Sequence, residues 1–336
     1  MLQFLTQRIL AALILLFLLS LVTFMVIHAK PGDYGDYIYS MMVARGMADD
    51  NARAMAEQVR IQYGLNDPIL IQYFNWIRGI VTRFDFGFSF SYNREVAAII
   101  SERLPRTILL ALTCHLLASA LGIGLGILAA TRQYSWADTL LSALSFIGMT
   151  VPRFLLALIL LYILAFKMNG QNFGTFFSSQ YGGAPWSWAK FVDLVQHVWP
   201  VVAIATFGGL AYNMRVMRAN LLDTLNAQYV ETARAKGLPE SAVILRHAVP
   251  NALHPLIAFQ GIALPYMLTG EIEVAIVFSL ATVGPAIVSS MAAGDIYVTA
   301  SFMLVLSATL MVGNILSDIL LSIVDPRIRL GGSASN

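Results

Sequence analysis

Long apolar runs, separated by polar and charged stretches, dominate the sequence. Six of them reach or exceed the roughly 20 residues that a helix needs to cross a bilayer core about 30 Å thick. A helix is the expected element for each, because other open backbone would leave N–H and C=O groups unpaired in hydrocarbon. The predicted spans cover residues 9–29, 104–130, 139–166, 198–218, 256–283 and 298–324. The sequence therefore predicts an all-α integral membrane protein with six transmembrane helices.

Composition agrees with a chain surrounded by lipid. Hydrophobic residues make up 58% of the 336 residues and charged residues only 12%, about half the charged share of a soluble domain. Mean hydropathy is +0.70. The net charge of +2, without a basic run interleaved with aromatic residues, argues against a nucleic-acid partner. The single cysteine, Cys114, lies inside a predicted span and is expected to pack as a small hydrophobic side chain.

The first span and the polar segment after it are expected to form separate parts. The run 9–29 follows Arg8, but it is longer than a signal-peptide core and no small-residue cleavage site follows, which favours a retained helix over residues 1–29. Residues 30–103 carry basic and acidic side chains in nearly equal number, the balance of a small external subdomain. Its aromatic residues form either a packing core, the favoured interpretation, or a platform for another protein. They include Tyr63, Tyr73, Phe74 and Trp76.

Basic residues near the spans predict the orientation, because cytoplasmic loops carry an excess of lysine and arginine. They gather at the N-terminus, after the second and fourth spans, and at the C-terminus. They are Arg8, Arg132, Arg215, Arg218, Arg234, Lys236, Arg246, Arg327 and Arg329. The connection 284–297 has none, as expected of an external loop. We therefore expect both termini in the cytoplasm.

Small residues and prolines within the spans predict where helices approach one another and where they break. Gly122 and Gly126 form a small-xxx-small pair that lets a neighbouring backbone approach closely. Pro152 and Pro265 are expected to interrupt the third and fifth helices, since proline removes a backbone donor. Broken helices inside a membrane are candidates for a pathway.

The segment 219–255, after the fourth span, predicts two short helices joined by a sharp corner. Residues 225–236 are rich in good helix formers, Gly237 suits the left-handed end of a helix, and Pro239 suits the first turn of the next one. A projection of this kind fits a groove in another protein. The alternative is an ordinary hairpin between two spans.

The corner contains Glu231-Thr-Ala-Arg-Ala-Lys-Gly237, followed after a short helix by Val249-Pro250. This pattern resembles the EAA loop of ABC importer permeases, with Thr232 in place of the first alanine and Val249 in place of the usual leucine. The resemblance implies a coupling helix that sits in a cleft of an ATPase subunit. Its coupling residues would be Glu231, Thr232, Ala233, Gly237 and Pro250.

Further motifs extend the resemblance over nearly the whole chain, to the B-type inner-membrane permease subunit of the dipeptide/oligopeptide/nickel family of binding-protein-dependent ABC importers. They are Pro31-Gly32-Asp33, Tyr63-Gly64-Leu65 with Pro68, Asp85-Phe86-Gly87-Phe88-Ser89, Leu104-Pro105-Arg106-Thr107 and Val324-Asp325-Pro326-Arg327-Ile328-Arg329. The family implies the type I importer permease (MetI-like) fold. In this chain it would comprise a permease core over residues 104–326 and a cytoplasmic tail over residues 327–336.

One segment departs from the family pattern. Ala275 stands where the family has a glutamate, and Phe278-Ser-Leu-Ala-Thr-Val-Gly284 lacks the usual Pro-Gly. Gly270-Glu271-Ile272 and Thr282-Val-Gly284-Pro285 resemble a branch that includes transporters of oligosaccharides as well as peptides. The resemblance thus implies import of di- or oligopeptides, with oligosaccharides or opine-like solutes as the alternative cargo.

Ionisable residues inside a membrane are costly and usually face protein or water. The candidates for the translocation pathway are therefore Pro152, Arg153, Glu271 and Glu273. Arg153 is expected to meet an anionic part of the cargo or a carboxylate of a partner permease. The alternatives are an arginine that reaches the membrane surface and glutamates placed at the helix end.

The sequence lacks the Gly-x-x-x-x-Gly-Lys-Ser/Thr phosphate loop, so the chain is predicted not to be an enzyme and to depend on hydrolysis by partners. The family implies a second homologous permease subunit in a heterodimer, two ATP-binding subunits that hold ATP and Mg²⁺, and a periplasmic solute-binding protein. These would assemble in a bacterial inner membrane. No cofactor or metal is expected in this chain, whose five histidines are scattered. A secondary transporter is the alternative class, although no internal repeat supports it.

Overall fold

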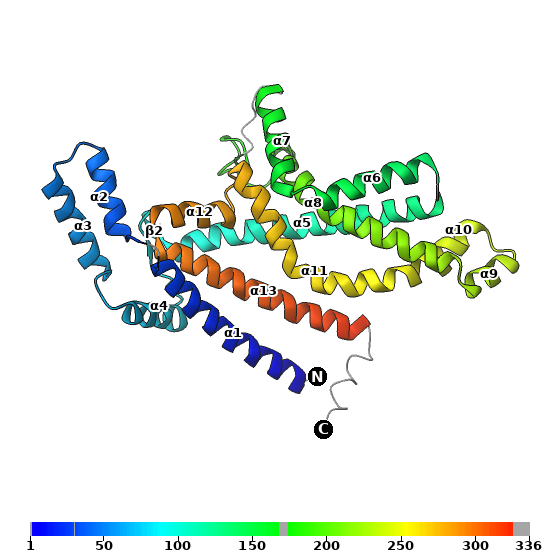
Figure 1. Cartoon of the computed structure of the whole chain (residues 1–336), viewed down its shortest axis with the longest axis horizontal. Coiled ribbons are helices and arrows are strands. Elements are labelled where there is room, and N and C mark those ends of the chain that lie inside the picture. The colour runs from blue at the N-terminus through cyan, green and yellow to red at the C-terminus, as the bar shows by residue number, and fades with distance from the viewer. Residues whose placement is uncertain (1, 30, 168–173, 325–336) are drawn as a thin grey trace. The chain divides into compact units, whose positions relative to one another are not determined.

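The computed structural model describes residues 2–29, 31–167 and 174–324, and these are helical almost throughout (Figure 1). Among them, four helices are long and apolar enough to cross a membrane, and the number is six if each of two bent helix pairs is one span. The predicted class, an all-α membrane protein, is confirmed. The predicted cytoplasmic tail, residues 327–336, lies outside the described residues.

The described chain divides into two compact units. The first contains the residues up to Arg106 together with Thr282–Ile315, and the second contains Thr107–Ala281 and the residues after Ile315. The helix that carries the second predicted span therefore begins in the first unit and continues in the second. The predicted limits of an external subdomain, residues 30 and 103, stay a prediction.

In the first unit the polar segment after the first span forms mainly helices. The elements of the whole unit are α1 (Leu2–His28), α2 (Tyr34–Ala44), α3 (Asp49–Tyr63), α4 (Ile69–Arg83), β1 (Phe88–Ser89), β2 (Arg94–Glu95), the start of α5 (Val96–Thr131), α12 (Val283–Ala293) and most of α13 (Ile296–Val324). The two strands pair antiparallel, with Phe88 opposite Glu95 and Ser89 opposite Arg94.

Aromatic side chains form a core between α1, α4 and α13. Tyr73 and Trp76 are 1% and 4% exposed, and both rings contact Phe24 of α1. Ser20 Oγ lies 2.8 Å from the Tyr73 hydroxyl, so that buried oxygen has a hydrogen-bond partner. The packing role favoured for the aromatic residues is confirmed for these two. Phe74, in contrast, is 63% exposed.

One buried carboxylate ties the β-hairpin to the start of α13. Asp295 has no exposed surface. One of its oxygens accepts hydrogen bonds from Ser89 Oγ at 2.7 Å, from Ser91 N at 3.0 Å and from Ser91 Oγ at 2.9 Å. The other accepts from Val298 N at 3.3 Å. Because a buried charge is tolerated only when hydrogen bonds replace its hydration, these bonds fix the hairpin against α13.

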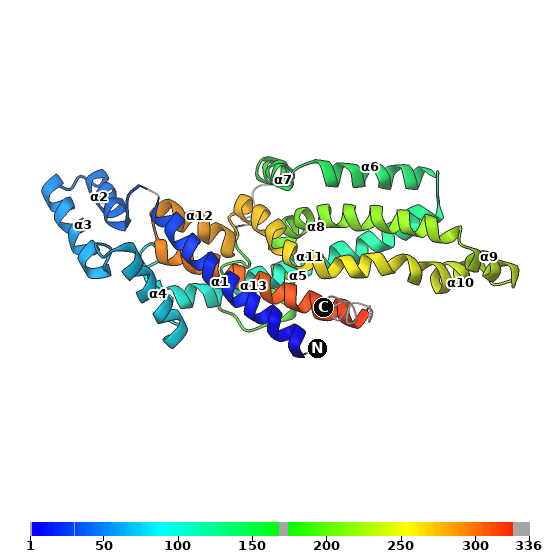
Figure 2. The same cartoon turned by 60° about the horizontal axis from the view of Figure 1, so that its bottom comes forward.

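Three expectations for the fifth span and the connection after it differ from the structure. The helix that carries this span, α11 (Val249–Phe278), continues through position 265, so Pro265 does not end it, although α11 changes direction along its length (Figures 1 and 2). It ends at Phe278 and not at residue 283, because Ser279 adopts a left-handed backbone with φ 54°. A left-handed serine has no signature in the sequence. The connection 284–297, expected as a loop, contains the helix α12.

The second unit is a bundle built around α8. Its elements are the rest of α5, α6 (Trp136–Thr150), α7 (Arg153–Lys167), α8 (Trp188–Leu225), α9 (Gln228–Ala235), α10 (Glu240–Ala242), the π-helical turn η1 (Val243–Ala248), α11 and the end of α13. Figures 1 and 2 show α8 running between α6 and α11, and it contacts both.

The predicted close approach at the glycine pair of α5 is confirmed. A Cβ placed on Gly122 would lie 2.7 Å from Cβ of Asn213, and one placed on Gly126 would lie 2.7 Å from the carbonyl oxygen of Met214. Both distances are shorter than van der Waals contact, so only glycine lets α5 lie this close to α8.

The third predicted span breaks at Pro152, as expected. α6 ends at Thr150 and α7 begins at Arg153, with a bend of 105° between them. Proline disfavours the helical conformation of the residue before it, and Val151 is extended, with φ −83° and ψ 127°. The bend makes Arg153 the first residue of a new helix.

Candidate functional site

The first candidate site is the corner between α9 and α10. Gly237 has a φ of +76°, and no atom lies within 4 Å of a Cβ built on it. Glycine adopts this left-handed conformation without strain, and the open surroundings leave the corner accessible. The predicted local structure, a helix that stops at a left-handed glycine, is confirmed.

An ion pair across Gly237 closes this corner. Arg234 Nη2 donates to Glu240 Oε1 at 2.8 Å, and Arg234 Nε donates to Glu240 Oε2 at 3.1 Å. The hydrogen bond from Arg234 holds the pKa of Glu240 below its usual value. Arg234 Nη1 also donates to the carbonyl oxygen of Leu225 at 3.3 Å. No spacing rule connects two residues on opposite sides of a glycine corner, so the sequence did not indicate this pair.

The predicted coupling residues lie in two different environments. Glu231 and Thr232 are exposed on α9, and Pro250 is exposed in the first turn of α11. Ala233 is only 5% exposed and belongs to a core cluster of this chain. Its small side chain therefore lets α9 pack against its own protein.

The corner stands on a packed base. Buried side chains from α8, α9, η1 and α11 meet beneath it and include Met217, Leu221, Val230, Val243 and Leu256. Protein interiors are packed nearly as densely as organic crystals and transmit strain. A displacement of the corner would therefore be passed to α8 and α11, which carry predicted spans.

Large apolar side chains stay exposed around the corner. Tyr229, Leu238 and Leu245 are 47%, 40% and 60% exposed. Single exposed apolar residues are common on any surface, but three on one short projection suit contact with another protein.

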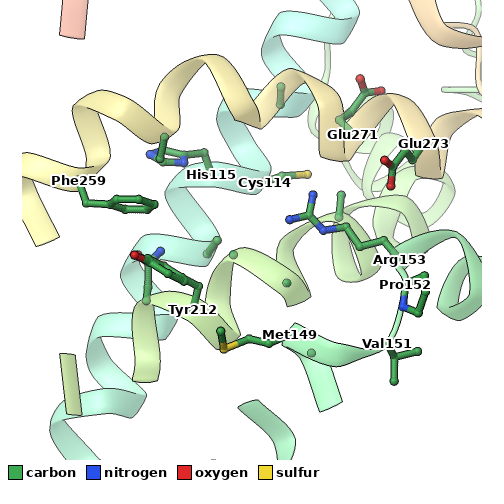
Figure 3. A pocket seen from close by; sticks show the side chains of 18 of the residues that line it. Cys114, His115, Met149, Val151, Pro152, Arg153, Tyr212, Phe259, Glu271 and Glu273 are labelled. Carbon is green, nitrogen blue, oxygen red and sulfur yellow. The ribbon is translucent and has the colours of Figure 1, made fainter. Parts of the chain in front are cut away.

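The second candidate site is a cavity of about 600 Å³ within the second unit (Figure 3). Residues of α5, α6, α7, α8 and α11 line it. The predicted pathway residues all belong to this lining, so the structure brings together side chains that lie far apart in the sequence. They are Pro152, Arg153, Glu271 and Glu273.

Arg153 points into this cavity from the start of α7 (Figure 3). A Cβ on Gly208 would lie 2.7 Å from Arg153 Nε and 3.1 Å from its Nη2, so the guanidinium rests against the bare backbone of α8. No carboxylate of the described residues forms an ion pair with it. Arginine stays charged at every physiological pH, and a charge within a membrane needs water or a polar group beside it.

The acidic residues Glu271 and Glu273 line the cavity from the last turns of α11, and Figure 3 shows the carboxylate of Glu273 on the side of Arg153 and that of Glu271 turned away from it. Glu271 is 1% exposed, whereas Glu273 is exposed. Cys114 of α5, which is 6% exposed, also lines the cavity. The cavity therefore carries a cationic group from α7 and anionic groups from α11.

Neutral polar groups line another part of the cavity. Ser119 Oγ donates to Gln260 Oε1 at 3.1 Å, and Gln260 Nε2 donates to Asn213 Oδ1 at 3.1 Å. These residues come from three helices, so the contact depends on helix packing and no sequence spacing predicts it. Gln260 and Asn213 line the cavity, together with the ring pair Tyr212 and Phe259, whose centroids are 4.6 Å apart.

Two family models match the chain. One, described as a binding-protein-dependent transport system inner membrane component, matches residues 122–330, and its N-terminal counterpart matches residues 1–111. The oligopeptide transport system permease protein AppB of Bacillus subtilis is 33% identical over 98% of this chain and 99% of its own. A candidate peptide permease of Brucella ovis is 30% identical over 98% and 100%. A candidate peptide ABC transporter permease of Sinorhizobium fredii is 28% identical over 97% and 99%.

Proposed function

The chain belongs to the family of binding-protein-dependent transport system inner membrane components, and we propose that it forms half of the pathway by which peptides enter a bacterial cell. The observation that carries the peptide assignment is the similarity, over nearly the full length, to relatives named as peptide permeases. The alternative cargo, an oligosaccharide or opine-like solute, rests only on the motifs around residues 270–285. Peptide is therefore the preferred cargo.

Partner subunits supply the energy in this proposal. Two ATP-binding subunits hold ATP and Mg²⁺ and hydrolyse the nucleotide, since this sequence has no phosphate-binding loop. One of them receives the corner at Gly237, where the exposed Glu231 and Thr232 and the exposed apolar side chains support a protein contact. A second homologous permease subunit completes the pore as a heterodimer, and a periplasmic binding protein delivers the cargo.

The proposed orientation in the inner membrane follows from the basic residues. Both termini and the segment 219–255 lie in the cytoplasm, and residues 30–103 lie in the periplasm. This arrangement puts the corner on the side where ATP is present. The cavity around Arg153 then forms part of the pathway, and each ligand shifts the transporter between its states only if it binds one state better than another.

Replacing Gly237 by aspartate tests the docking role. The Gly237→Asp variant places a charge at an open, left-handed corner, so it should leave the membrane helices inserted but separate ATP hydrolysis from transport. We expect peptide uptake into proteoliposomes to fall about 10-fold or more while hydrolysis by the assembled complex continues, a loss typical of one disrupted interface anchor. Normal uptake by this variant would count against the docking role.

Gly46 offers a matched control. It has a φ of +85° and, like Gly237, no atom within 4 Å of a Cβ built on it, but it lies between α2 and α3, in the first unit. Gly46→Asp imposes the same backbone strain and the same charge. It should leave the ratio of peptide taken up to ATP hydrolysed unchanged, which separates a docking effect from a general effect of the substitution.

A further inference from the structure

We propose that the cavity at the α6–α7 break is a carboxylate-binding subsite, in which Arg153 receives the terminal carboxylate of the cargo. This inference rests on the proposed function, because a peptide is the cargo that would supply a free terminal carboxylate. It goes further in naming the group that is recognised and the residue that recognises it. Four features of the cavity support it.

The first feature is the position of the arginine. The break at Pro152 makes Arg153 the first residue of α7, and α7 meets α6 at 105°. The start of a helix carries partial positive charge from its unpaired amides, and broken membrane helices use such ends to hold anionic groups of a transported solute. The guanidinium of Arg153 and the start of α7 together form one region of positive potential on the cavity wall.

The second feature is the space made for the guanidinium. Gly208 of α8 has no side chain, and any Cβ there would overlap Arg153 Nε at 2.7 Å. The flat guanidinium therefore lies against backbone, and its edge remains available to a ligand (Figure 3). Guanidinium nitrogens form a fork that matches the two oxygens of a carboxylate.

The third feature is the absence of a competing anion at that fork. Within the described part of the chain, no carboxylate forms an ion pair with Arg153, although Glu271 and Glu273 line the same cavity. Arg218 of α8 is a contrasting case. It is held by Asp138 at 2.6 Å.

The fourth feature is the order of charge along the cavity. The carboxylates lie on α11 and the guanidinium lies on α7 (Figure 3). A peptide with free ends carries one charge of each sign, so this order favours its carboxylate beside Arg153. The neutral groups of Gln260 and Asn213, which also line the cavity, suit the amides between the two ends.

The test compares two probes that differ only in the proposed group. Trialanine has a free carboxylate, and trialaninamide replaces it with a neutral amide. Uptake of each is measured in proteoliposomes that contain the whole transporter, with the same binding protein throughout. Any change in the ratio of the two uptake rates between variants then arises in the permease. Arg153→Gln should slow trialanine uptake about 10-fold or more, as expected for loss of a charged hydrogen-bond partner, and change trialaninamide uptake less than about two-fold.

Matched variants identify the cause of any loss. Arg153→Lys keeps the positive charge but lacks the paired guanidinium donors, so its trialanine uptake rate should lie between those of the wild type and Arg153→Gln. Gly208→Ala leaves Arg153 in place but displaces its guanidinium, so it should reproduce the selective loss. Gly124→Ala adds the same methyl group at a position with nothing within 4 Å and should change neither rate. Arg132→Gln removes an exposed arginine and serves as the charge control.

A second measurement does not depend on the binding protein. Met149 lines the cavity and is 45% exposed, so a Met149→Cys variant of the whole transporter can be labelled with a small thiol reagent. Trialanine should slow the labelling, trialaninamide should not, and the protection by trialanine should disappear when Arg153→Gln is added. Equal protection by both probes, or none by either, would overturn the proposal.

The outcomes separate this inference from the proposed function. If the wild-type transporter imports no peptide at all, the proposed function fails. If it imports both probes and Arg153→Gln slows them equally or not at all, only the carboxylate subsite fails. A loss of assembly with the second permease in Arg153→Gln would assign the arginine to a carboxylate of that partner, and it would overturn the proposal.

Discussion

Arg60 joins three carboxylates at the start of the polar segment. Its Nε donates to Asp33 Oδ2 at 2.8 Å and its Nη2 donates to Asp36 Oδ1 at 2.7 Å, while Glu57 lies 3.5 Å away. Asp33 and Asp36 also form the capping box that begins α2. One side chain of α3 thereby fixes the first turn of α2, so these two helices depend on a single cation.

This arrangement predicts acid sensitivity of α2 and α3. Burial raises the pKa of Asp33, but the hydrogen bond and charge of Arg60, together with backbone amides, leave it below the ordinary value of 3.8. A carboxyl group with a lowered pKa in the folded state stabilises that state above its ordinary pKa, and the contribution is lost as pH falls through the lowered pKa. Protection factors of the α2 and α3 amides, from hydrogen exchange of the whole chain, should therefore fall below about pH 4.

Two variants show whether Arg60 is responsible. Arg60→Gln should lower the protection factors of the α2 amides near neutral pH, and these factors should then fall less when the pH is lowered. Arg53→Gln removes the ion pair between Arg53 and Asp49, whose side chains are 70% and 53% exposed. It should change the protection factors little, because exposed ion pairs contribute little to stability. Identical pH profiles for Arg60→Gln and the wild type would contradict the assignment.

At the scale of elements, one ion pair joins α6 to α8. Asp138, which is 3% exposed, accepts from Arg218 Nε at 2.6 Å and from Nη2 at 2.8 Å. The backbone amide of Tyr134 donates to the same carboxylate at 3.0 Å. Two parallel bonds to one carboxylate give the strongest geometry that an arginine offers, so the pair fixes the distance between the two helices.

Removing one member of the Asp138–Arg218 pair should lower the free energy of unfolding more than removing both. Arg218→Gln leaves a buried carboxylate without its partner, and we expect the unfolding free energy in detergent to fall by about 3 kcal/mol. The double variant with Asp138→Asn should recover part of this loss. Arg215→Gln, an exposed arginine on the same helix, should cost little. A double variant no more stable than Arg218→Gln would show that the loss does not come from the uncompensated carboxylate.

The elements that could be predicted from the sequence are those that length and apolarity specify. All six apolar runs correspond to helices, and the break at Pro152 follows from the chemistry of proline. The end of α11 and the existence of α12 could not be predicted, because the turn at Ser279 has no glycine or proline to indicate it. α11 continues through Pro265 but changes direction along its length (Figure 1), so a proline within a predicted span does not by itself end the helix.

The candidate site could be predicted only in part, for a related reason. The corner at Gly237 is local in sequence, and its left-handed glycine followed by Pro239 indicated it. Gly208 and Gln260, in contrast, acquire a role only because α8 and α11 pack around the cavity. Likewise, Ala233 is buried because η1 and α8 cover it. Contacts between helices that are distant in sequence depend on packing, which no local pattern specifies.

At the scale of the whole molecule, the central claim is that the energy for transport enters through the corner at Gly237. The sequence contains no phosphate-binding loop. The corner is open at its tip and packed at its base onto α8 and α11, which carry predicted spans. In the proposed mechanism, a subunit that hydrolyses ATP moves the membrane helices by holding this projection.

The most direct test is chemical cross-linking from the tip of the corner. The one native cysteine, Cys114, is buried, so a Leu238→Cys variant offers the thiol beside Gly237 to a bifunctional reagent, with Gly46→Cys as the control. In the assembled transporter, Leu238→Cys should cross-link to an ATP-binding subunit, with a yield that differs between the ATP-bound and nucleotide-free states, and Gly46→Cys should not. No cross-link from Leu238→Cys in any nucleotide state, in a complex that still imports peptide, would contradict the claim.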